Sequence, residues 1–112
     1  MNELLDSFED LIEETYLDVI SRYPGFGHEL YSLLKDYHPE VFKRLTFYKR
    51  LELQTEDSYA VYDDGPRSFA IQLDPLCEVI VLWNHEFQTE IGTWCEDPVE
   101  EALHLIGTEM IK

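Results

Sequence analysis

The sequence predicts an α+β domain: a four-stranded antiparallel meander with helices before it and a C-terminal helix packed on one face. Two observations predict this class. Apolar residues recur every three to four positions before residue 50 and after residue 97, which is typical of amphipathic helices. Between residues 55 and 95 they recur every second position, which is typical of strands. A chain of 112 residues fits a single domain (1–112), with 1–50 mainly helical, 55–95 an antiparallel sheet and 97–111 a closing helix.

Three helices are predicted before the sheet. The first spans residues 3–22, where apolar residues follow helical spacing and the other positions are mostly carboxylates. Pro24 ends it, because proline cannot continue a helix. The second is GHELYSLLKDY, residues 27–37. The third is PEVFKRLTFYKRL, residues 39–51, whose leading proline suits the first position of a helix.

Four alternating segments separated by turn residues predict the strands. They are SYAVYD (58–63), RSFAIQLD (67–74), EVIVLWN (78–84) and EFQTEIGTW (86–94). Since every connection is short, neighbouring strands should pair antiparallel.

The hydrophobic pattern predicts the register of these strands. The predicted pairs are Leu82 with Phe87, Ile71 with Ile80, and Asp63 with Arg67 across a three-residue turn. This register gives one apolar face, which the helices should cover. Its members are Tyr59, Val61, Phe69, Ile71, Leu73, Ile80, Leu82, Phe87 and Ile91.

The same register sends the other strand residues to a second face that is polar but also rich in aromatic side chains. Its members are Ala60, Tyr62, Ser68, Ala70, Gln72, Val79, Val81, Trp83, Glu86, Gln88, Glu90 and Trp94. Two interpretations are open: a docking surface for another protein, or a face buried beneath the last helix or part of the third. The candidate partner-binding residues of the docking interpretation are Tyr62, Trp83, Glu86, Glu90 and Trp94.

The closing helix has the clearest local signals. Asp97 is a favourable N-cap, Pro98 fits the first helical position, and Glu100 completes a capping box. Apolar residues follow at helical spacing as far as Met110.

The charge balance is strongly acidic. There are 24 Asp and Glu residues against 8 Lys and Arg, a formal net charge of −16. Such a field repels nucleic acid and anionic membranes and favours a basic protein partner. An acidic surface that only maintains solubility is the other interpretation. The N-terminus lacks the pattern of a signal peptide and the chain has no run long enough for a membrane helix, so a cytoplasmic protein is expected.

No catalytic motif is present, and we expect neither an enzyme nor a bound cofactor. The histidines lack HExxH spacing, so no metal site is expected, and Cys77 and Cys95 do not form a CxxC pair. The two thiols could still lie near each other in the sheet. A cysteine–histidine nucleophile also stays open, although no local signature supports it. Glycine-rich phosphate loops and the GxSxG motif are missing as well.

The segment EVIVLWNHEFQTEIGTWCEDPVEEALHLI, residues 78–106, resembles bacterial immunity proteins of polymorphic-toxin and contact-dependent growth inhibition systems. The shared features are a hydrophobic strand ending in Trp, an acidic hairpin, and W-x-x-D-P before a closing helix. The residues that carry them are Trp83, Glu86, Glu90, Trp94, Asp97 and Pro98. The resemblance covers about a quarter of the chain.

The resemblance implies a protein that binds a cognate toxin domain, such as a nuclease, and neutralises it through an acidic and aromatic surface. The alternative is an acidic regulatory or adaptor protein, or a nucleic-acid mimic, that binds a basic host protein.

Overall fold

The computed structural model describes residues 11–22, 25–50, 58–63, 67–73, 79–84, 88–92 and 94–110. The strands in these ranges are β1 (Leu11–Glu14), β2 (Leu45–Arg50), β3 (Ser58–Tyr62), β4 (Phe69–Leu73), β5 (Val79–Asn84) and β6 (Gln88–Gly92). The helices are α2 (Tyr16–Arg22), α3 (Phe26–Tyr37), α4 (Pro39–Lys43) and α5 (Pro98–Leu105), and α5 continues into a π-helical segment, η2 (Ile106–Met110).

The strands form one six-stranded antiparallel sheet in the order β1-β2-β3-β4-β5-β6, so each strand pairs with its neighbour in the chain. The predicted α+β class and antiparallel meander are confirmed. The predicted number of four strands is wrong, because the described residues contain two further strands, β1 and β2, in the region predicted to be helical.

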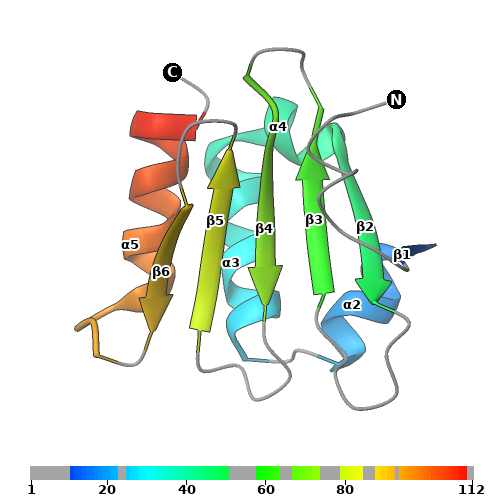
Figure 1. Ribbon diagram of the computed structural model, residues 1–112, viewed down its shortest axis with the longest axis horizontal. Helices are drawn as coiled ribbons and strands as arrows, with labels where there is room; N and C mark the ends of the chain where they lie inside the picture. Colours follow the sequence, from blue (N-terminus) through cyan, green and yellow to red (C-terminus); the bar gives the residue numbers. More distant parts are fainter. Residues whose placement is uncertain are drawn as a thin grey trace.

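The four described helices lie on one side of the sheet (Figure 1). We call the sheet surface beneath them the first face and the opposite surface the second face. Buried residues of the first face and of the helices form one core cluster. The sheet contributes Phe47, Ala60, Tyr62, Phe69, Ile71, Leu73, Ile80, Leu82 and Ile91, and the helices and η2 contribute Val19, Leu30, Tyr31, Leu34, Val41, Val99, Ala102, Ile106 and Met110.

Residues 11–22 do not form the single helix that the sequence predicted; residues 3–10 lie outside the described part of the chain. Residues 11–14 form β1, and α2 begins after Thr15. The Asp18 N–H donates to Thr15 Oγ1 and the Thr15 N–H donates to Asp18 Oδ2, both at 3.2 Å. These reciprocal bonds satisfy backbone donors that the first turn leaves open. The short motif T-Y-L-D therefore marks where the helix begins.

The predicted third helix, 39–51, is correct for its first turn only. Helix α4 ends at Lys43, and the chain continues as β2. The alternation of β2 places Phe47 on the first face, while Thr46 and Tyr48 lie on the second. Phe47 packs edge-to-face against Tyr31 of α3, with ring centroids 5.2 Å apart. Residues 45–50 form a strand and not a helix because β-branched and aromatic side chains, such as those of Thr46, Phe47 and Tyr48, pack well on a pleated sheet. Strand β2 has a neighbouring strand on each side, β1 and β3.

The strand faces of β4, β5 and β6 agree with the prediction, although the exact pairs differ. Ile71 lies opposite Leu82 and Ile80 lies opposite Ile91, so each register is shifted by two residues. A shift of two leaves every side chain on its predicted face, because side chains alternate with a period of two. The predicted partner Phe87 lies outside the described residues.

The register of β3 differs by one residue, and this reverses its two faces. Tyr62 lies opposite Phe69 and Ala60 opposite Ile71. Ala60 and Tyr62 therefore belong to the core, while Tyr59 and Val61 face the other way. Tyr62 packs on Phe69, with ring centroids 5.2 Å apart. At the end of these two strands, Ser68 Oγ donates a hydrogen bond to Asp63 Oδ1 at 3.0 Å. The partner of Asp63 across the turn is therefore Ser68 and not the predicted Arg67.

The second helix and the closing helix are confirmed. α3 covers the predicted residues 27–37, and α5 begins at Pro98 with Asp97 as its N-cap. Asp97 Oδ1 accepts a hydrogen bond from the Glu100 N–H at 3.2 Å.

We expect Tyr62→Ala to lower the free energy of unfolding by about 3–5 kcal/mol, because it removes a large buried side chain from the core. Tyr62 is 6% exposed, whereas Tyr37 on α3 is 68% exposed. The matched variant Tyr37→Ala should therefore change stability by less than about 0.5 kcal/mol. Urea denaturation of both variants checks this. Equal, small effects would instead support the register in which Tyr62 lies on the second face.

Candidate functional site

The structure separates the four candidate partner-binding residues that it describes. Tyr62 is buried in the core, so its predicted place on the second face is wrong. Trp83 lies on the second face and is half-buried, and its Nε1–H donates to Gln72 Oε1 at 3.0 Å. Glu90 is exposed on β6, and Trp94 is exposed in the turn that follows it. Glu86 lies outside the described residues.

The centre of the second face matches neither of the two interpretations. Tyr59, Val61 and Ala70 are buried and form a second, smaller cluster, against which Tyr48 and Trp83 pack. This centre is therefore not an open docking surface. The described helices do not cover it either, since they lie on the first face (Figure 1). Trp83 is held in place by this packing and by its hydrogen bond to Gln72.

The exposed aromatic and acidic residues meet instead at the corner between β6 and α5. Trp94 is 66% exposed there. Next to it in the chain, a cleft of about 610 Å³ opens to solvent. We call Trp94 and the residues of this cleft the acidic corner. The cleft is lined by Cys95, Glu96, Asp97, Glu100, Glu101 and His104.

The local sequence explains how Trp94 is presented. The Cys95 N–H donates to the Gly92 carbonyl at 2.9 Å, which closes a turn directly after β6. The Trp94 ring lies against Gly92, and a Cβ atom on Gly92 would overlap that ring. Asp97 then caps α5. The W-x-x-D-P pattern thus follows the end of β6 and consists of a turn with an exposed indole and the start of α5.

The part of the chain that contains this corner is strongly acidic in sequence. All eight Lys and Arg lie outside residues 68–111. That segment contains Asp74, Glu78, Glu86, Glu90, Glu96, Asp97, Glu100, Glu101 and Glu109. Because cations are missing from the segment, its carboxylates add up to a negative potential that attracts basic groups.

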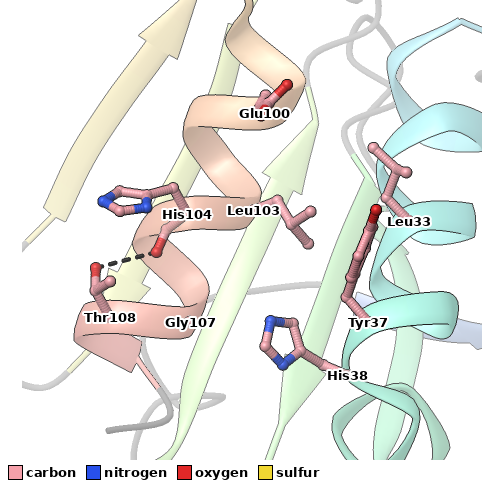
Figure 2. A pocket seen from close by; sticks show the side chains of 8 residues that line it. All are labelled: Leu33, Tyr37, His38, Glu100, Leu103, His104, Gly107 and Thr108. Atoms are coloured by element: carbon pink, nitrogen blue, oxygen red, sulfur yellow. Dashed lines mark hydrogen bonds between the residues drawn. The ribbon is translucent and has the colours of Figure 1, made fainter.

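A second cleft lies between α3 and the α5–η2 helix (Figure 2). It has a volume of about 510 Å³ and is lined by Leu33, Tyr37, His38, Glu100, Leu103, His104, Gly107 and Thr108. Sequence analysis did not predict this cleft. Helical spacing predicts that Tyr37 points inward together with Leu30, Leu33 and Leu34, but the structure leaves Tyr37 68% exposed. No local sequence pattern marks this cleft, because it depends on how two helices that are distant in the chain pack together.

The described residues contain no group of three or more His, Cys, Asp or Glu side chains that could hold a metal ion. Cys95 is a free, half-buried thiol. Cys77 and His85 lie outside the described ranges, so the predicted proximity of the two cysteines is not tested. Among the helices described above, none has the length and apolar character needed to cross a membrane.

In comparisons with known proteins, the chain matches no family model, no curated protein and no solved structure.

We expect Gly92→Ala to displace the Trp94 indole from the surface of β6, because the new Cβ would occupy the position of the ring. The indole is largely exposed and can move, so the free energy of unfolding should change by less than about 1 kcal/mol. Fluorescence and the indole N–H resonance of Trp94 can be read without interference in a Trp83→Phe background.

The matched control is Gly25→Ala, whose new Cβ meets nothing within 4 Å. It should leave the Trp94 signals unchanged. An unaltered indole resonance in Gly92→Ala would contradict the packing of Trp94 on Gly92.

Tyr48 on the second face gives a prediction about alkaline pH. Burial raises the pKa of Tyr48 above 10.0, and the nearby carboxylates of Glu13 and Asp63 raise it further. The folded state therefore keeps the phenol proton at a pH where the unfolded state has lost it. The stability associated with neutral Tyr48 is present below pH 10 and is lost as pH rises through the folded-state pKa. Absorbance titration should show that Tyr48→Phe loses a tyrosine that ionises at higher pH than an ordinary phenol. Loss of a tyrosine that ionises in the ordinary range would contradict this.

Proposed function

We propose that the protein is an immunity protein, which binds a cognate bacterial toxin domain through the acidic corner and neutralises it. The observation that carries the proposal is Trp94, an indole that is 66% exposed among carboxylates in a segment without Lys or Arg. The resemblance of residues 78–106 to immunity proteins supports the same function, because its W-x-x-D-P pattern forms this corner.

The arrangement suits tight binding to a basic protein. Tryptophan is enriched among the interface residues that dominate binding energy, and surrounding groups exclude water from it. The carboxylates Glu90, Glu96 and Glu101 surround Trp94 in sequence and are all exposed. Opposite charges on the two partners accelerate encounter, to roughly 10⁸–10⁹ M⁻¹s⁻¹ at low salt. Fast capture matters for a protein that must stop a toxin before it acts.

A toxin that cleaves nucleic acid is the target that this chemistry fits best. Such an enzyme binds phosphates in a basic groove, since phosphate binding requires clustered cations. Carboxylates presented by the acidic corner can occupy the same positions and exclude the substrate. The four carboxylates of the cleft, those of Glu96, Asp97, Glu100 and Glu101, would supply the negative charge.

The test is to purify the protein with the toxin domain encoded next to its gene and to measure complex formation and toxin activity. A stable complex that abolishes activity supports the proposal. Absence of both a complex and protection would refute it. A complex with a basic host protein, and none with a toxin, would instead identify an acidic adaptor or nucleic-acid mimic.

We expect Trp94→Ala to weaken binding of that toxin by about 2 kcal/mol or more, as truncation of a central interface aromatic does. Its effect on the free energy of unfolding should stay below about 0.5 kcal/mol, because the side chain is mostly exposed. The matched control is Leu17→Ala on α2, another exposed apolar residue, at 74% exposure. Binding calorimetry and denaturation of both variants check this, and equal affinities for the two would place the interface elsewhere.

We also expect affinity for the toxin to fall as salt concentration rises, since screening shortens the reach of the field to about 8 Å at physiological ionic strength. Reversing a charge at the corner, Glu96→Lys, should slow association more than Glu13→Lys on β1, although both change the net charge equally. Stopped-flow association rates at several salt concentrations measure this. Rates that respond equally to both variants would show that net charge alone, and not the acidic corner, guides the partner.

A further inference from the structure

The cleft between α3 and α5 has an unusual combination of walls. Leu33 and Leu103 face each other across it from the two helices, and the Tyr37 ring lies along α3 (Figure 2). Glu100 lies one helical turn before Leu103, at the end of the cleft near the start of α5. His38 forms the opposite end and approaches Gly107, where a Cβ would lie 3.4 Å from His38 Nε2.

These walls define the chemistry of an occupant. The leucines favour an alkyl chain, because burial of apolar surface is favourable. The exposed face of Tyr37 attracts a cation, and the guanidinium group of arginine in particular stacks on aromatic rings. Glu100 can accept hydrogen bonds from the same group, and arginine forms such bonds in pairs. An anionic side chain would be repelled by Glu100 and by the acidic corner beside it.

The cleft is continuous with the acidic corner, because Glu100 and His104 line both. A protein bound at the corner would therefore have the cleft within reach of one of its side chains. Gly107 lies at the far end of the cleft, where an added Cβ would be in ordinary van der Waals contact with His38.

We propose that this cleft accepts one arginine side chain of the basic partner, with the alkyl stem between Leu33 and Leu103 and the guanidinium group against Tyr37 and Glu100. The proposal rests on the proposed function only for the origin of the arginine. The cleft itself can be tested without the partner, so the two proposals can fail separately.

The experiment is an NMR titration of the ¹⁵N-labelled protein with Nα-acetyl-arginine amide. Shift changes are expected at Leu33, Tyr37, His38, Leu103 and Gly107. The neutral isostere Nα-acetyl-citrulline amide should produce much smaller changes at these positions, because it lacks the positive charge. Nα-acetyl-lysine amide should bind more weakly than the arginine compound, since an ammonium group cannot stack on Tyr37 in the same way.

Two variants assign the binding to the cleft. Glu100→Gln should weaken arginine binding by about fivefold, which corresponds to roughly 1 kcal/mol. Glu109→Gln removes the same charge at an exposed position that lines neither cleft, and it should bind like the unaltered protein. Thermal denaturation of both variants confirms that each remains folded.

Three results would overturn the proposal: equal shifts with arginine and citrulline compounds, equal losses in Glu100→Gln and Glu109→Gln, or shifts centred on Glu96 and Glu101 instead of the cleft. The last result would show that arginine responds only to the general negative field. Suppose that the toxin binds and that its binding requires Trp94, but that the arginine compound does not bind in the cleft. The proposed function then stands, and only the arginine site is refuted.

Discussion

The burial of one sheet face under α3 and α5 is the interaction on which the rest of the structure depends. Residues of β2 to β6 meet Leu30, Leu34, Ala102 and Ile106 in one cluster, and each large buried side chain contributes about 1.5–3 kcal/mol. Because the described helices all lie on this face, their outward surfaces are left for contacts with other molecules. The acidic corner and the cleft between α3 and α5 both lie in that helical layer.

The elements with strong local signals were predictable from the sequence. α3 and α5 have helical periodicity with recognisable ends, and β3 to β6 alternate with a period of two. Of the two missed strands, β2 lies where both periods fit the same residues. In β2, Leu45 and Tyr48 satisfy helical spacing, while Leu45 and Phe47 satisfy strand spacing. Only the available partners, β1 and β3, decide between them, and these are non-local contacts.

The register of β3 shows a similar limit. A shift of one residue exchanges Tyr59 with Tyr62, and both choices bury one tyrosine beneath the helices. The packing of Tyr62 on Phe69, together with the fit of Tyr59 and Val61 beside Ala70, selects the observed register. For the candidate site, the sequence placed Trp94 and Glu90 on the second face together with Tyr62, and it left open whether that face is exposed or buried. The cleft between two helices was beyond prediction, because it depends on how α3 and α5 lie against each other.

The sequential strand order has a further consequence for association between copies of this protein. Within the described residues, β1 and β6 each have a hydrogen-bonded neighbour on one side, and such edge strands can template aggregation. Both carry exposed carboxylates, Glu13 on β1 and Glu90 on β6. Two copies that joined edge to edge through β6 would bring like charges together in a newly formed ladder. The acidic side chains that we propose for binding a basic partner therefore also discourage the sheet from extending into a fibril.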